Sequence, residues 1–263
     1  MAKSLPYDIL GHIIDILAAE GDLTPVKNIS LTSSLLLHFC RTHIFHTISA
    51  ITKKPLISLL GSNPAIAQYI RKLDYSVYHD DNKLSPLLPN LLQTISLLEC
   101  LKIAGSLGFK WTKIDPLIRS SILYLMHLPT LTHLVIQGME KIPISALAPC
   151  INLEQLEILY VALAPFEDQS SPSLRMSRSQ TPRILRFRNL KSEKAVERLL
   201  RTKGKDGHPV LDFANVKTLV LQLEMFQDVR LTPLTRELFE NISCLEEIEI
   251  DGKFTCQILL FKL

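Results

Sequence analysis

Residues 131–136, LTHLVI, contain the pattern that decides the fold: Leu131 and Leu134 stand three apart, and Ile136 follows after one further residue. The unit recurs along the chain after Ile51, with a degenerate copy at Leu185, and its middle position falls at Leu73, Leu101, Leu134, Leu156, Leu185, Leu219 and Ile248. Successive middle positions differ by 28, 33, 22, 29, 34 and 29 residues. A period of this size predicts an array of supersecondary repeats.

Each unit predicts one short strand. The apolar alternation that ends the unit is typical of a strand with one buried face. Residues 116–129, 192–204 and 232–245, which precede three of the units, have helical character. A strand and a helix repeated at this period stack into a solenoid, with a parallel sheet on the concave side and helices and loops on the convex side. The alternative is that leucines fall at these spacings by chance.

The first fifty residues follow a different pattern. Residues 5–17, LPYDILGHIIDIL, predict a helix with Pro6 in its first turn. Its apolar side chains form two neighbouring rows rather than one. A second helix is expected to begin near residues 22–25, and apolar residues continue at helical spacing to Ile48. Because so short a segment makes a very small core, we expect part of its apolar surface to meet another molecule.

This segment resembles an F-box domain over about residues 4–49. The shared run is L-P-x-D-I-L-x-x-I-I-x-x-L, then D-L, then a helix ending in C-R-x-x-I-F-x-x-I. The tryptophan that the family often has late in its second helix is absent. The resemblance implies docking on a Skp-type adaptor, and through it on a cullin, with these adaptor-binding residues: Leu5, Pro6, Ile9, Leu10, Ile13, Leu17, Leu23 and Phe45. The alternative is that the helices only cap the following domain.

F-box domains are known to pair with leucine-rich repeats, whose period the second region matches. In that family the repeats bind the protein to be ubiquitinated. The side chains expected to point outward from the concave sheet, and so to bind this substrate, are Asp74, Lys102, Val135, Glu157, Arg186, Arg188, Val220 and Glu249. Such a mixture of charged and aliphatic residues suits a protein surface better than a small-molecule pocket. The alternative is a solvated sheet face.

We therefore predict the α/β fold class, with an all-α F-box-like domain at residues 1–50 and an irregular leucine-rich-repeat solenoid at residues 51–263. Residues 164–183 lose the periodicity and gain Ser, Pro and Arg, which predicts a flexible insertion. The predicted function is a non-enzymatic substrate receptor of an SCF-type ubiquitin ligase. The alternative is a repeat scaffold or interaction protein outside the ubiquitin system.

Charge is unevenly distributed. Residues 175–205 contain eleven basic residues and two acids, so this segment carries +9 and the rest of the chain −6. The segment could bind an acidic or phosphorylated partner, because arginines pair with phosphate oxygens, or it could be an ordinary solvated helix. It offers only Phe187 to stack a base, which argues against nucleic acid as a partner.

The sequence shows no catalytic constellation. The G-x-S-x-G, G-x-x-x-x-G-K, H-E-x-x-H and G-x-G-x-x-G motifs are absent. Residues His38, Cys40, His43 and His46 would bind a metal only if all four converged, so we expect no metal and no cofactor. A hydrolase would need a Ser or Cys nucleophile beside a histidine and an acid.

Five scattered cysteines without a C-x-x-C pair indicate a reducing compartment, and we expect the protein in the cytoplasm, the nucleus or both. Asp8 interrupts the first apolar run, which argues against a signal peptide. Residues 120–139 contain no charge and are long enough to cross a bilayer. Because they include Pro129, two histidines and several hydroxyls, we predict a buried helix end followed by a buried strand, and no membrane partner.

Overall fold

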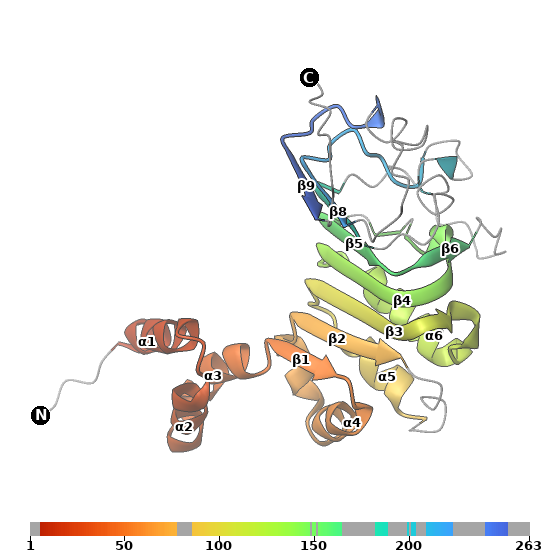
Figure 1. Ribbon diagram of the computed structural model, residues 1–263. Coiled ribbons are helices and arrows are strands. Elements are labelled where there is room, and N and C mark those ends of the chain that lie inside the picture. Colours follow the sequence, from red (N-terminus) through yellow and green to blue (C-terminus); the bar gives the residue numbers. More distant parts are fainter. Residues whose placement is uncertain are drawn as a thin grey trace, which may run out of the picture. The chain divides into compact units, whose positions relative to one another are not determined.

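The computed structural model describes residues 6–77, 86–147, 149–150, 152–164, 182–188, 199, 201–203, 209–222 and 240–251. In these ranges the chain forms a nine-stranded sheet with several helices, and the strand order is β1-β2-β3-β4-β5-β7-β8-β9, with β6 beside β4 (Figure 1). Every strand pairing given below is parallel. The chain divides into two compact units, residues 1–106 with 112–134 and residues 107–111 with 135–263.

The first unit begins with helices and continues as alternating helices and strands. Its described elements are α1 (Tyr7–Ala19), α2 (Thr24–Thr32), η1 (Ser34–Leu36), α3 (Leu37–Ile44), β1 (Thr47–Ala50), α4 (Lys53–Ser62), η2 (Pro64–Tyr69), β2 (Lys72–Val77), α5 (Leu88–Gln93) and α6 (Pro116–Met126). Strand β3 (Cys100–Lys110) and the short helix η4 (Trp111–Lys113) contribute residues to both units.

The described elements of the second unit are mostly strands. They are β4 (His133–Pro143), whose first two residues belong to the first unit, η5 (Ile144–Ala146), β5 (Gln155–Leu159), β6 (Ala162–Ala164), β7 (Ile184–Arg188), β8 (Thr218–Gln222) and β9 (Glu247–Asp251). The predicted insertion at residues 164–183 and the predicted helices at 192–204 and 232–245 lie mostly outside the described residues.

The strand register follows the sequence repeat. Leu73 of β2 stands opposite Leu101 of β3, and β5, β7, β8 and β9 align their own middle positions in the same way. The aligned positions from β2 to β8 are at most 1% exposed: Leu73, Leu101, Leu134, Leu156, Leu185 and Leu219. The predicted parallel sheet of the α/β class is therefore confirmed, with the repeated leucines as its buried column.

One main-chain contact recurs where the strands begin. Before six of the aligned positions, the carbonyl two residues earlier accepts hydrogen bonds from two successive N–H groups of the next strand segment. Arg71 O, for example, accepts from Glu99 N at 2.8 Å and Cys100 N at 2.9 Å. The carbonyls with this pattern belong to His46, Arg71, Glu99, Glu154, Arg183 and Lys217. These main-chain hydrogen bonds join consecutive repeats in addition to the apolar packing between them.

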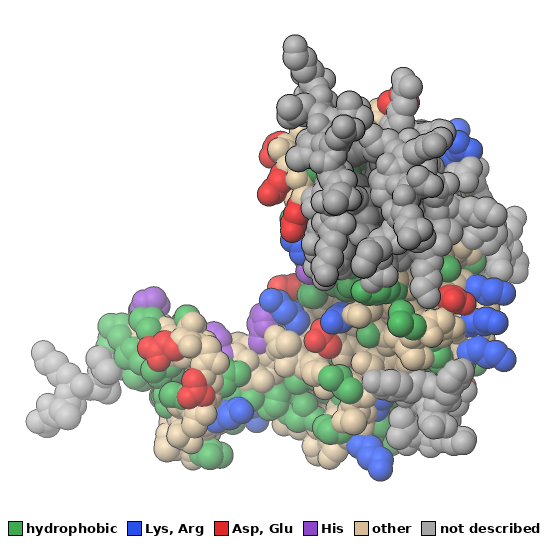
Figure 2. Space-filling view, in the orientation of Figure 1, with side chains coloured by type: hydrophobic (Ala, Val, Ile, Leu, Met, Phe, Trp, Pro, Cys, Tyr) green, Lys and Arg blue, Asp and Glu red, His purple; other side chains and the backbone are tan. Residues whose placement is uncertain are grey.

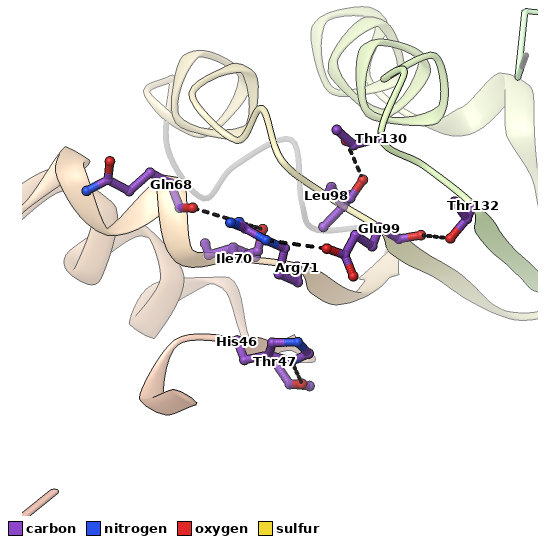
Figure 3. Close-up of polar contacts among 9 residues, drawn as sticks. All are labelled: His46, Thr47, Gln68, Ile70, Arg71, Leu98, Glu99, Thr130 and Thr132. Carbon is purple, nitrogen blue, oxygen red and sulfur yellow. Dashed lines mark hydrogen bonds and ion pairs between the residues drawn. The ribbon is translucent and has the colours of Figure 1, made fainter. Parts of the chain in front are cut away.

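In the first unit, side chains add polar contacts at the end of the sheet where these strands begin (Figure 3). The Arg71 guanidinium lies 3.5 Å from the Glu99 carboxylate and donates to Gln68 O at 2.7 Å. The Thr130 hydroxyl donates to Leu98 O at 2.7 Å. Because the Arg71 and Glu99 side chains are 28% and 52% exposed, solvent weakens the ion pair, and it contributes less to stability than the main-chain contacts it accompanies.

Strand β1 was not predicted. The sequence suggests helical spacing up to Ile48, but α3 ends at Ile44 and residues 47–50 pair with β2, with Ile48 opposite Leu73. The column of aligned apolar residues therefore begins one strand earlier than the repeat pattern indicates.

The charge-free stretch at residues 120–139 is confirmed as a helix end followed by a strand. Helix α6 is capped by Asp115, whose carboxylate accepts hydrogen bonds from Leu117 N at 2.8 Å and Ile118 N at 3.3 Å, and it ends at Met126. Strand β4 then begins at His133. Across the described part of the chain, none of the helices combines the length and apolar character that crossing a membrane requires.

Candidate functional site

The N-terminal helices pack around a very small core. Ile14 of α1, Val26 of α2 and Cys40 of α3 are fully buried, and half-buried apolar side chains surround them. Gly11 lets α1 approach α3, because a Cβ at this position would lie 2.9 Å from a ring carbon of Phe39. The fold of the segment thus depends on close contact between α1 and α3.

Helix α1 carries a second apolar row that the small core does not use. Ile9, Ile13 and Ile16 are 44%, 40% and 52% exposed. Their spacing of four and three residues places them on one face of the helix. Gly11 and Ile14 lie on the opposite, buried face. Figure 2 shows apolar side chains at the surface of the N-terminal helices.

Further apolar side chains are exposed at the turn between α2 and α3. Leu31 is exposed, and Leu35 is 63% exposed. The Tyr7 hydroxyl donates a hydrogen bond to Leu35 O at 3.0 Å, and the Tyr7 ring lies 4.6 Å from the Phe39 ring, centroid to centroid. These contacts fix the start of α1 against the η1 turn, so the exposed groups are held in place rather than loosely attached.

The predicted adaptor-binding residues fall into three groups. Pro6, Ile9 and Ile13 are exposed, and Leu10 and Phe45 are half-buried. Leu17 and Leu23 pack against the small core, so within the segment they have a structural role. Leu5 lies outside the described residues. The prediction omitted Ile16, Leu31 and Leu35; the spacing of Ile16 from Ile9 and Ile13 would have revealed the first of these.

The start of α2 is fixed by Asp22. Its carboxylate accepts a hydrogen bond from Thr24 N at 2.9 Å. The hydrogen bonds from the main-chain N–H and the hydroxyl of Thr24 lower the pKa of Asp22 below its usual value. The carboxylate therefore stays charged at the N-terminus of the helix, where negative charge is favourable.

The four His and Cys side chains that could have formed a metal site have separate surroundings. His38 Nδ1 lies 3.1 Å from the Tyr69 hydroxyl, His43 Nε2 lies 2.8 Å from Asp15 Oδ1, and Cys40 is buried in the small core. His46 Nδ1 lies 3.2 Å from Thr47 Oγ1. In the ranges that the structure covers, no three His, Cys, Asp or Glu side chains are placed to hold a metal ion.

Within each unit, most of the predicted substrate-binding residues stand opposite one another on neighbouring strands. Asp74 stands opposite Lys102 in the first unit. In the second unit the row runs Glu157, Arg186, Val220, Glu249. The exposure along the row is uneven: the four charged residues from Asp74 to Arg186 are half-buried, Glu249 is exposed, and Val135 and Val220 are only 7% and 4% exposed. Arg188 is the last residue of β7, and its side chain is not described.

One polar cluster stands out in this row. Arg186 Nη1 lies 3.1 Å from Glu157 Oε1, and the Gln155 amide donates to the same oxygen at 2.6 Å. The Glu157 side chain is 14% exposed, so its charge is largely compensated within the protein. A partner that met this part of the sheet would find a neutralised acid rather than a free one.

The thiols that the structure covers are unbridged. Cys40 and Cys150 are buried, Cys100 is half-buried, and Cys244 is exposed. Burial raises the pKa of Cys150 to about 12, and it raises that of Cys40 as well. Neither buried thiol is therefore a ready nucleophile.

The sequence matches no model of a known protein family, and a comparison with curated proteins found no match.

Proposed function

We propose that the chain is a non-enzymatic substrate receptor of an SCF-type ubiquitin ligase. In this proposal the N-terminal helices dock on a Skp-type adaptor, and the repeats form a leucine-rich-repeat solenoid that holds the protein to be ubiquitinated. The same proposal places the protein inside the cell, in the cytoplasm, the nucleus or both.

The observation that carries the proposal is the exposed row of Ile9, Ile13 and Ile16. A helix whose apolar residues served only its own domain would bury them on one face. Here the buried face and the exposed row are opposite each other, and the exposed row is apolar. Side chains of this kind on a small, internally packed segment are typical of a surface that meets another protein.

Two observations support the solenoid. The repeat positions stand opposite one another in β1–β3 and in β5, β7, β8 and β9, and the two-donor carbonyl contact recurs at six strand starts. Both indicate one unit repeated along the chain, each unit contacting its neighbours, as in repeat proteins that bind partners on an extended surface. The proposed substrate-binding positions are Asp74 and Lys102 in the first unit and Glu157, Arg186 and Glu249 in the second.

The test is a binding measurement between the full-length chain and a purified Skp-type adaptor. A variant with Ile13→Asp and Ile16→Asp places two charges in the exposed row without touching the buried face. We expect the parent to bind and the variant to bind at least about tenfold more weakly. Each substitution removes an apolar contact and also places an unpaired charge in the interface, where it loses its hydration. Circular dichroism checks that the variant keeps its helices.

The matched control is Leu117→Asp on α6, where the side chain is 66% exposed. This change introduces the same group at an exposed leucine outside the proposed interface and should leave adaptor binding unchanged. If the parent fails to bind the adaptor, the ligase proposal is wrong and a repeat scaffold outside the ubiquitin system becomes the better explanation. Equal binding by the parent and the double variant would remove the role of the isoleucine row.

A further inference from the structure

Strand β9 is the last strand in the described sheet order. Its one described neighbour is β8, with Leu219 opposite Ile248 and Val220 opposite Glu249. Among the residues that the structure covers, no strand pairs with the other edge of β9. An edge strand presents main-chain N–H and C=O groups that a further extended segment can use.

Ile248 indicates that the packing at this edge is incomplete. It occupies the same register column as Leu185 and Leu219, both of which are fully buried. Ile248 is nevertheless 42% exposed. The apolar column that is covered from β2 to β8 is therefore only partly covered at β9, and a segment added there would bury the remaining apolar surface.

The same strand is acidic. Glu247 and Glu249 alternate with Ile248 and therefore lie on the opposite face of the sheet, and both are exposed. Glu246, just before the strand, is bound by Lys217 at 2.5 Å. No described residue brings a cationic group within ion-pair distance of Glu249.

The opposite edge of the sheet has another character. Strand β1 is four residues long, and its sequence, TISA, contains no charged side chain. Its column residue, Ile48, is half-buried, whereas Ile248 is 42% exposed, so the exposed acids and the more exposed isoleucine distinguish β9 from β1.

We infer that β9 is a docking edge for an extended, basic segment of a partner protein, which adds as a further strand. Main-chain hydrogen bonds would supply part of the affinity, and side chains at alternate positions would supply the specificity. Because neighbouring residues of a strand point to opposite faces, the segment should alternate basic residues, facing Glu247 and Glu249, with apolar residues, facing Ile248. Binding at this edge does not require the adaptor.

A second copy of the chain fits this edge poorly. Two β9 strands brought together would place Glu247 and Glu249 close to the same acids of the other copy. Like charges on neighbouring strands are destabilising, whereas a lysine or arginine in that position is stabilising.

The experiment uses a fluorescent peptide in which lysine and valine alternate, titrated with the full-length protein and followed by anisotropy. Two comparison peptides are an equivalent with glutamate for lysine and one of the same charge with prolines at alternate positions. We expect the lysine peptide to bind, the glutamate peptide not to bind, and the proline peptide to bind at least about tenfold more weakly, because proline cannot donate to a strand pairing.

Two protein variants of equal charge change locate the site. Glu247→Lys with Glu249→Lys should weaken peptide binding at least about tenfold, since two attractive cross-strand pairs become repulsive. The control, Glu20→Lys with Glu154→Lys, reverses two exposed acids that lie outside β9 and should keep most of the affinity. If the charge reversal on β9 impairs folding, Glu249→Gln alone should also weaken binding of the lysine peptide, but by a smaller factor.

Hydrogen exchange supplies an independent measurement. Bound lysine peptide should slow the exchange of main-chain amides in residues 247–251. If the proline and lysine peptides bind equally well, binding depends only on general charge attraction, and the proposal that β9 is a docking edge is wrong. Equal losses in both pairs of charge reversals would overturn it as well. Self-association of the parent that Ile248→Asp abolishes would instead identify a second copy as the occupant.

Discussion

The N-terminal helices and the repeats use apolar residues in opposite ways. The repeats align their leucines into a column in which each member from Leu73 to Leu219 is almost completely buried. The helices fully bury only Ile14, Val26 and Cys40 among their apolar side chains and leave a row of isoleucines exposed. A side chain in the column packs against the aligned side chains of two neighbouring strands. The core between the helices is very small, so it can bury only a few of their apolar side chains. Surplus apolar surface is therefore expected on the helices, where a partner can cover it.

The largest expected effect compares one residue of each kind. Leu73→Ala removes a side chain between Ile48 and Leu101 and should lower the free energy of unfolding by about 2–5 kcal/mol. Ile16→Ala, on the exposed row, should change it by less than about 0.5 kcal/mol. Urea unfolding of both variants measures the difference. Similar losses would mean that the exposed row stabilises the isolated protein, and the contrast between the two regions would fail.

A pair of glycine substitutions tests how tightly the helices pack. Gly11→Ala brings a methyl group to 2.9 Å from the Phe39 ring and should cost about 1–3 kcal/mol of stability. A methyl group added at Gly61 in α4 would meet no atom within 4 Å, so Gly61→Ala should stabilise by up to about 1 kcal/mol, since alanine favours the helix. The two changes therefore have opposite signs. If Gly11→Ala left the free energy of unfolding unchanged, the contact between α1 and α3 would accommodate an added methyl group easily.

The two buried thiols allow a comparison of the two cores, because each variant keeps the thiol of the core that it reports on. One variant retains only Cys40, in the helices, and another retains only Cys150, in the second unit of the sheet; alanine replaces the remaining cysteines. Labelling of a buried thiol requires opening of its surroundings, and a small core opens more readily. We expect Cys40 to react with a thiol reagent at least about tenfold faster than Cys150 in native buffer. The reverse order would indicate that the helices are the more stable region.

The strands of the repeat could be predicted because their core positions are close in sequence. The spacing of Leu131, Leu134 and Ile136 predicts one strand directly. The repeat period then predicts the positions of the other strands. Strand β1 was missed for a local reason. Four residues are too few for alternation to be distinguished from the helical spacing that Ile44 and Ile48 also satisfy.

The site was predicted less completely, since burial depends on residues distant in sequence. Val135 and Val220 were expected on an open face but are almost fully buried, and no local pattern predicts what covers them. The contrast between Ile13, which is exposed, and Leu17, which packs inward, likewise depends on where α2 and α3 lie. Ile16 is different, because its helical spacing from Ile9 and Ile13 was visible from the start.

The smallest expected effect concerns His46, which lies between the two regions. Its main-chain carbonyl accepts hydrogen bonds from Arg71 N and Lys72 N, so it belongs to the repeat, while its side chain follows directly on α3. Burial lowers the pKa of its imidazole below the usual 6.5, and Lys72 lowers it further, whereas Glu99 acts in the opposite direction. The folded protein therefore resists protonation at this residue more than the unfolded chain does.

This difference sets the direction of the pH dependence. As the pH falls through about 6.5 toward the lower folded-state pKa, the unfolded chain binds the proton first, and stability decreases. Above that range His46 is neutral in both states and contributes no slope. Urea midpoints measured at about pH 7.5 and pH 5 should therefore differ less in His46→Asn than in the parent. An equal or larger difference in the variant would contradict the assigned direction, because removing a group that favours protonation on unfolding must flatten this part of the curve.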